Sequence, residues 1–119
     1  MNTGGEMLTF NLNKKWFDKI KSGEKTHEYR EVKPYWSRRI DNFLKQYQYL
    51  DEDDEYSAII FDDLHCEFVC GYAAKNDRTK HLKAKILSIT IKNGLDTDLK
   101  IDTDVFDIEF ELIKGGIYE

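Results

Sequence analysis

Two long segments in the second half of the chain alternate apolar and polar residues, and this period constrains the fold more than any other feature. His81 to Lys92 and Val105 to Ile113 both show the two-residue period of a β-strand. In Val105 to Ile113 the polar partners are mostly acidic, which predicts a strand with one side in solvent. Asn93-Gly94 is a turn signal between the two segments. In the first strand we expect one face to carry Leu82, Ala84, Ile86, Ser88 and Thr90 and the other to carry Leu87, Ile89 and Ile91.

The rest of the chain predicts two amphipathic helices and four further strands. One helix covers Lys14 to Ser22 after a capping Asn13, and Gly23 suits the position just past its end. The second begins at Pro34, a residue that is tolerated in the first turn, and runs through apolar positions to Tyr47. The other strands are predicted at Met7 to Leu12, Thr26 to Val32, Ser57 to Asp62 and Glu67 to Ala74.

Five or six strands with two helices in the N-terminal half indicate the α+β class. The 119 residues suit a single domain, which we place at 1–119. The periodicity alone does not choose between an open sheet and a small barrel.

Composition bounds the cellular setting of the domain. No run of about 18 apolar residues predicts a membrane helix, and no apolar segment of a secretory signal follows the N-terminus. Two cysteines, Cys66 and Cys70, are too few for a disulfide scaffold. We therefore expect a reduced, cytoplasmic protein that does not contact membranes.

The segment Gly23-Glu24-Lys25-Thr26-His27-Glu28-Tyr29-Arg30 concentrates charged and aromatic side chains where a predicted helix meets a predicted strand. Strand parity places Glu28 and Arg30 on one face, where the guanidinium would hold the carboxylate ionised and keep donors for a ligand. Lys25 joins them only if the turn after Gly23 redirects it. The alternative is a solvated ladder of ion pairs, worth under about 1 kcal/mol.

The pattern G-x-K-x-x-E-x-R, here Gly23, Lys25, Glu28 and Arg30, resembles the signature of the ASCH domain family. The resemblance covers about residues 8 to 40 and includes the Pro34-Tyr35-Trp36 stretch that follows the motif. It implies a PUA-like small mixed β-barrel, because the family resembles the PUA fold of RNA-modifying proteins. It also implies that the motif lines a ligand cleft.

The first functional hypothesis is therefore binding of RNA or a nucleotide. Tyr35 could stack on a base, and we leave its role open, whereas the helical spacing favours a core position for Trp36. Arg38 and Arg39 could meet phosphate or could pair with Asp41 or the acidic loop that follows. The predicted ligand-binding residues are Gly23, Lys25, Glu28, Arg30, Tyr35, Arg38 and Arg39.

The second hypothesis, also implied by the resemblance, is an amidohydrolase that acts on an acylated or otherwise modified cytidine-type nucleoside. Such relatives use the motif lysine with a threonine and a distant glutamate. Here the position three residues after Lys25 is Glu28, so only Lys25 transfers and Glu28 would be the base in a different arrangement. The third hypothesis is a protein-interaction module without a small ligand, whose partner the sequence does not name.

We expect no cofactor and no metal. His65, Cys66, Cys70 and His81 are metal-ligating types, but they lack the paired spacing of a zinc site. A buried-thiol interpretation fits the two cysteines, which share a strand face.

The net charge of −5 is unevenly distributed. Lys14 to Lys45 holds ten basic and five acidic residues, and Lys75 to Lys85 holds five basic residues and Asp77. Because local potential governs the binding of an anion, this distribution permits a focused nucleotide-sized site. It argues against general coating of nucleic acid, which needs a broadly basic surface.

Overall fold

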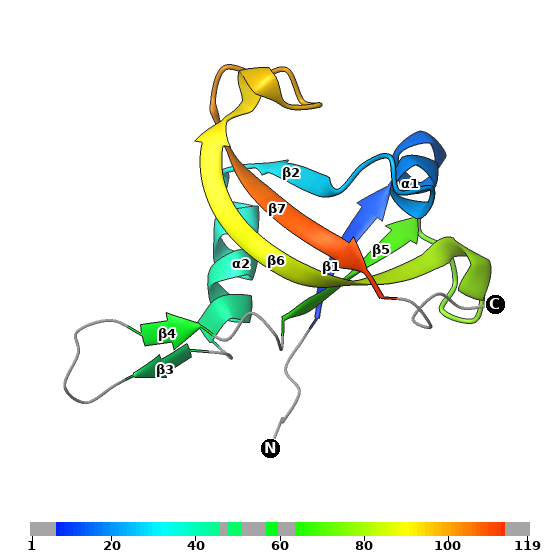
Figure 1. The fold of residues 1–119 in the computed structure, drawn as a ribbon, viewed down its shortest axis with the longest axis horizontal. Helices are drawn as coiled ribbons and strands as arrows, with labels where there is room; N and C mark the ends of the chain where they lie inside the picture. Colours follow the sequence, from blue (N-terminus) through cyan, green and yellow to red (C-terminus); the bar gives the residue numbers. More distant parts are fainter. Residues whose placement is uncertain (1–6, 46–47, 51–56, 60–63, 114–119) are drawn as a thin grey trace.

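The structure is a computed structural model that describes residues 7–45, 48–50, 57–59 and 64–113. Within these residues the chain forms a five-stranded sheet, a two-stranded sheet and two α-helices (Figure 1), so the predicted α+β class is confirmed. The large sheet has the order β1-β5-β6-β7-β2, with β1 at Leu8–Leu12, β5 at His65–Cys70, β6 at His81–Asn93, β7 at Asp104–Leu112 and β2 at His27–Glu31. The small sheet pairs β3 at Gln48–Leu50 with β4 at Ser57–Ile59.

The large sheet is curled into part of a barrel. β6 and β7 are its longest strands and bend strongly (Figure 1). β1 pairs with β5 in parallel, and the other strand pairs are antiparallel. The backbone ladders of the described residues leave β1 and β2 as the two edges, and a side chain bridges them: Arg30 Nη2 donates to the Asn11 carbonyl at 3.2 Å. The mixed sheet is therefore curled as a small barrel would require, while membership in the PUA-like fold stays a prediction.

Both helices lie where the sequence predicts them. α1 (Lys14–Lys21) begins after Asn13, whose side chain accepts a hydrogen bond from the Trp16 backbone N–H at 3.1 Å. It buries Phe17 and Ile20. α2 (Pro34–Lys45) begins at Pro34 and buries Ile40 and Phe43, while Tyr47 lies outside the described residues. Each helix thus packs one apolar stripe inward, as amphipathic helices do.

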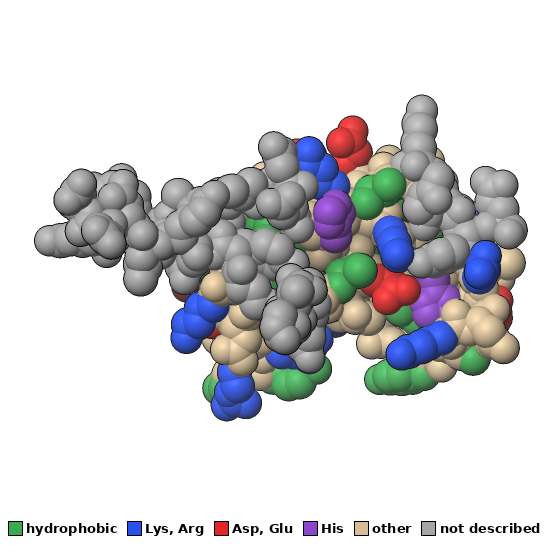
Figure 2. Space-filling model, turned by 90° about the horizontal axis from the view of Figure 1, so that it is seen from below, with side chains coloured by type: hydrophobic (Ala, Val, Ile, Leu, Met, Phe, Trp, Pro, Cys, Tyr) green, Lys and Arg blue, Asp and Glu red, His purple; other side chains and the backbone are tan. Residues whose placement is uncertain are grey.

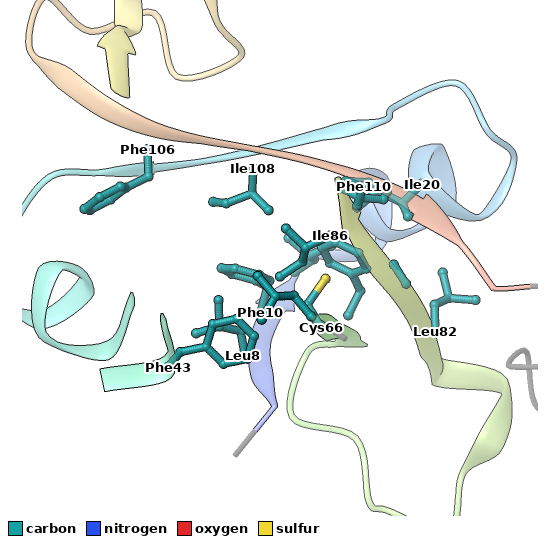
Figure 3. Packing of buried hydrophobic residues seen from close by; sticks show 14 of the residues in the cluster. Leu8, Phe10, Ile20, Phe43, Cys66, Leu82, Ile86, Phe106, Ile108 and Phe110 are labelled. Carbon is teal, nitrogen blue, oxygen red and sulfur yellow. The ribbon is translucent and has the colours of Figure 1, made fainter. Parts of the chain in front are cut away.

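The core fills the space between the concave side of the sheet and the helices. Figure 3 shows side chains from β1, α1, α2, β5, β6 and β7 pointing into this space. Phe68 stands at its centre, with ring centroids 4.6 Å from Phe110 and 5.7 Å from Phe10. Phe10 in turn lies 5.2 Å from Trp36, which is half-buried and packs on the core as predicted.

The prediction of which residues of β6 lie on each face of the sheet is wrong beyond Ile86. A register shift between Ile86 and Ser88 leaves Leu87 unpaired and 41% exposed. One extra residue reverses the parity of everything after it. Ile89 therefore lies opposite the buried Ile108 and packs against the core, whereas Thr90 is exposed.

Strand boundaries differ from prediction in the middle of the chain. The strand predicted at Glu67–Ala74 is β5, which starts at His65 and ends at Cys70. It ends there because Gly71 has φ 63°, a backbone conformation that glycine adopts readily. The described part of the predicted strand Ser57–Asp62 is β4, and residues 60–62 and the acidic residues of 51–56 lie outside the described residues.

The connection between β6 and β7 is longer than the turn signal at Asn93-Gly94 suggests. The chain does turn there, and the Leu95 N–H donates to the Asn93 side chain at 2.9 Å. It then forms a short 3-10 helix, η3 (Gly94–Asp96), and continues to Asp104 before the next strand starts. In Figure 1 this connection lies above β2, so it brings a distant part of the sequence to the motif. None of the described helices is long and apolar enough to span a lipid bilayer.

Candidate functional site

The turn after α1 redirects Lys25 toward the next strand. Gly23 has φ 88° and its N–H donates to the Ile20 carbonyl at 3.0 Å, which ends the helix. The chain then folds back, and the Lys25 N–H donates to the Lys19 carbonyl at 3.0 Å. Gly23 is exposed and acts through its backbone conformation.

Lys25, Glu28 and Arg30 converge, as the strand parity and the turn require. Arg30 Nε and Nη2 lie 2.8 Å and 2.7 Å from Glu28 Oε2, and Lys25 Nζ lies 3.6 Å from Glu28 Oε1. Lys25 Nζ also pairs with the carboxylate of Asp98, from the β6–β7 connection. We call these four side chains the charge cluster.

Glu28 is the buried centre of the charge cluster. Its side chain is only 6% exposed, against 10% for Lys25, 21% for Arg30 and 35% for Asp98. Burial raises the pKa of Glu28 above its usual value, and the charges and hydrogen bonds of Arg30 and Lys25 oppose that rise. A buried carboxylate is tolerated here because two cations hold it, which makes the arrangement more than a solvated ion-pair ladder.

Aromatic rings lie close to both cations of the charge cluster, Lys25 and Arg30. Lys25 Nζ lies 5.4 Å from the ring centroid of Trp16 and 5.0 Å from that of Tyr29. Arg30 Cζ lies 5.1 Å from the ring of Phe10 and 5.0 Å from that of Trp36. All four distances suit cation–π attraction. Each cation therefore has two aromatic rings within cation–π distance.

Three adjoining hollows surround the charge cluster, and Trp16 and Tyr29 line all three. Their volumes are about 250, 100 and 450 Å³. The first two include Lys25 and Asp98, and the third reaches Arg30 and Asn11. We call these three hollows, which lie between α1, β2 and the β6–β7 connection, the motif groove. The third hollow has the volume of ordinary small-ligand sites.

The predicted ligand residues on α2 lie elsewhere. Tyr35 is 58% exposed, Arg38 is exposed, and Arg39 Cζ lies 5.6 Å from the Tyr35 ring. Like Gly23, these three do not line the motif groove. Of the seven predicted ligand residues, the groove therefore contains Lys25, Glu28 and Arg30.

Sequence reasoning missed three groove residues that lie next to the Lys25 ammonium. Asp98 is 73 positions from Lys25, and no local pattern in the sequence predicts their contact. Trp16 belongs to the apolar face of the predicted helix, and Tyr29 has the opposite strand parity to Glu28, so neither was expected beside Lys25. The aromatic content of the helix and strand that flank the motif was the available signal.

The histidine and cysteine side chains are the candidate metal ligands that the sequence offers. Among the described residues no three histidine, cysteine or acidic side chains form a group that could hold a metal ion. Cys66 is fully buried in the core, and burial raises the pKa of its thiol far above the usual value. His81 lies on the outer side of the sheet, where its Nδ1 is 2.8 Å from Glu67 Oε2 and its Nε2 is 2.9 Å from the Ala74 carbonyl.

His81 makes the stability of the domain pH-dependent. Burial lowers its pKa, but the bonds to Ala74 and Glu67 and the charges of Glu67 and Asp77 outweigh burial and raise the pKa overall. Its imidazolium therefore stabilises the fold below the unfolded-state pKa of about 6.5, and this contribution is lost as pH rises through the folded-state value. We expect His81→Gln to lower the melting temperature more at about pH 5.5 than at about pH 8.5. Equal losses in thermal melts at both pH values would contradict this account.

Comparison of the chain with family models, with curated proteins and with solved structures found no match in any of the three.

Proposed function

We propose that the motif groove binds an unpaired nucleotide, either free or within single-stranded RNA. The observation that carries the proposal is the position of the Lys25 ammonium, which lies 5.4 Å and 5.0 Å from the ring centroids of Trp16 and Tyr29 and next to two carboxylates. Aromatic walls with charged groups beside them can accept a flat, polar, aromatic ligand. Every nucleobase has a π-face, and stacking on one aromatic side chain contributes about 1–3 kcal/mol per base.

The charge cluster favours a ligand that both donates and accepts hydrogen bonds. Lys25 and Arg30 supply donors, while Glu28 and Asp98 supply acceptors. Base edges present acceptors and exocyclic amines side by side, whereas phosphate presents acceptors alone. Lys19, Lys25 and Arg30 line the groove and are the cations that can meet a phosphate attached to such a base.

The geometry gives the amidohydrolase hypothesis less support. The Lys25 ammonium contacts two carboxylates and two aromatic rings, so it acts as a donor. A general base needs an unprotonated amine with a free lone pair. Glu28, the other candidate base, is 6% exposed and is bound by Arg30.

Lys25→Met tests the proposal, because it removes the ammonium and keeps most of the apolar stem. We expect it to weaken the binding of nucleoside monophosphates and of a short unstructured RNA about tenfold or more in calorimetric titrations, since a charge-assisted hydrogen bond is lost. Lys21→Met, at the last residue of α1 and outside the groove, is the matched control and should bind like the parent.

Two results would overturn the proposal. The first is equal affinity of Lys25→Met and the parent for every nucleotide tested. The second is turnover of acylated nucleosides, followed by chromatography, that Lys25→Met abolishes, because the site would then be an amidohydrolase. A domain that binds no nucleotide but captures a protein through the groove would support the third hypothesis.

A further inference from the structure

A second hollow lies on the outer side of the large sheet, away from the core. Its volume is about 540 Å³, and it extends over β1, β5 and the start of β6 beneath the connection between β5 and β6. The residues that matter for its chemistry are Asn11, Glu67, Tyr72, Lys75, Arg78 and His81. We call it the basic hollow.

The rim of the basic hollow is anchored to β1. The Gly71 N–H donates to the Leu12 carbonyl at 2.7 Å, and the Asn11 side chain donates to the Gly71 carbonyl at 2.7 Å. The next residue, Tyr72, is 93% exposed, although an aromatic ring of this size is usually packed. A fixed backbone thus presents an uncovered ring at the edge of a concave surface.

Positive charge dominates the basic hollow. Lys75 and Arg78 lie on its rim, and both ring nitrogens of His81 face acceptors, namely Glu67 and the Ala74 carbonyl. Only a doubly protonated imidazole can donate to both acceptors. Glu67 is the one acidic residue of the lining. Figure 2 shows basic side chains gathered around a histidine at this end of the molecule.

The basic hollow and the motif groove meet at Asn11. This residue lines both depressions, and β1, which carries it, is an edge strand of the sheet. Among the described residues, no further strand pairs with β1 on this side. A flexible ligand chain can therefore leave the groove near Arg30, cross β1 at Asn11, and reach Tyr72.

We propose that the basic hollow is a second contact site for a single-stranded polynucleotide, whose phosphates meet Lys75 and Arg78 and one of whose bases stacks on Tyr72. The inference rests on the proposed function for the nature of the ligand, and it extends the ligand from one nucleotide to a strand. Basic grooves with exposed aromatic rings bind single strands in this way, whereas a duplex keeps its base faces covered. Because the net charge of the whole chain is −5, we expect the strand to contact only this local basic surface.

The test uses fluorescence anisotropy with an unstructured labelled oligoribonucleotide of about eight residues. The double variant Lys75→Ala/Arg78→Ala is compared with Lys45→Ala/Lys92→Ala, which removes the same charge outside both depressions. We expect the first to weaken binding about tenfold at low salt and to reduce the slope of log K against log salt by about 1.4, which corresponds to two phosphate contacts. The control should match the parent in affinity and slope.

Variants of Tyr72 and a mononucleotide probe complete the experiment. Tyr72→Ala should weaken oligonucleotide binding about tenfold, while Tyr72→Phe keeps the ring and should bind normally. Lys75→Ala/Arg78→Ala should leave the affinity for a nucleoside monophosphate unchanged, because a single nucleotide occupies only the groove. A deoxyoligonucleotide of the same sequence separates RNA from DNA as the source of the strand.

The outcomes separate this inference from the proposed function. If Lys25→Met weakens binding but Lys75→Ala/Arg78→Ala binds the oligonucleotide with the parent's affinity and slope, the inference is wrong and the proposed function stands. If the double variant loses the oligonucleotide and Lys25→Met does not, the basic hollow is supported and the groove is refuted. A parent protein that binds neither probe refutes both.

Discussion

Replacing Arg30 by alanine is expected to lower the free energy of unfolding by about 3 kcal/mol. Both Arg30 contacts to Glu28 are 2.8 Å or shorter, and their loss would leave a buried carboxylate with Lys25 as its only cation in the charge cluster. The variant also loses the bond to the Asn11 carbonyl, which joins the two edge strands, and the packing on Phe10 and Trp36. The pKa of Glu28, already raised by burial, should rise further.

Chemical denaturation of Arg30→Ala and of Arg38→Ala measures this effect. Arg38 is exposed on α2, so its removal should change the unfolding free energy by less than about 0.5 kcal/mol. Arg30→Met combined with Glu28→Leu replaces both partners by apolar groups and should recover much of the loss, because no unpaired carboxylate remains. If Arg30→Ala is no less stable than Arg38→Ala, the pair is a surface ion pair and the account of Glu28 is wrong.

Replacing Phe10 by alanine is expected to destabilise the domain by about 4 kcal/mol. Phe10 is fully buried and lies between the rings of Trp36 and Phe68, so its removal leaves a cavity that neighbouring side chains fill only in part. Its ring also supports the Arg30 guanidinium at 5.1 Å. We therefore expect weaker nucleotide binding as well as lower stability, because the loosened guanidinium no longer holds Glu28 in one position.

Calorimetric unfolding of Phe10→Ala, with Leu87→Ala as control, tests this coupling. Leu87 is 41% exposed at the bulge of β6, and its truncation should cost well under 1 kcal/mol, as is usual for surface changes. Binding is compared at a temperature at which both variants are folded. A Phe10→Ala domain that keeps the parent's nucleotide affinity would show that the core does not position the site.

The secondary structure follows from local patterns in the sequence wherever those patterns are undisturbed. Asn13 caps α1 and Pro34 starts α2, because capping side chains and proline act through neighbouring backbone groups. The pairing of strands in the large sheet did not follow, since it depends on contacts far apart in sequence. The bulge at Leu87 is of the same kind: an extra residue in one strand is defined only against its partner, and it reversed the predicted faces of Ser88 and Thr90.

The candidate site was likewise predictable only where its residues are close together in the sequence. Lys25, Glu28 and Arg30 lie within six consecutive residues, so strand parity and one glycine turn were enough to predict that they come together. Asp98 reaches Lys25 only because the β6–β7 connection extends over β2. Gly94 helps to fix this connection, since a Cβ there would lie 2.7 Å from the Ile101 carbonyl oxygen. The spacing of residues in the sequence does not predict such close packing.

Charge explains why the composition alone was a poor guide. The net value of −5 includes the acidic residues of 51–63 and 96–111 together with two basic segments. The structure places residues of one basic segment at the motif groove and residues of the other at the basic hollow. A ligand responds to the potential at these depressions more than to the sum over the chain.

Nuclear magnetic resonance titration of the labelled domain with nucleoside monophosphates tests the central claim most directly, because it locates the ligand without any substitution. We predict that the indole N–H of Trp16 and the backbone amides of Lys25, Tyr29 and Asp98 shift together and saturate at one dissociation constant, while the amides of α2 stay in place. Shifts confined to other surfaces, or no shifts at concentrations of about 10 mM, at the weak end of specific binding, would contradict the assignment of the motif groove as a nucleotide site.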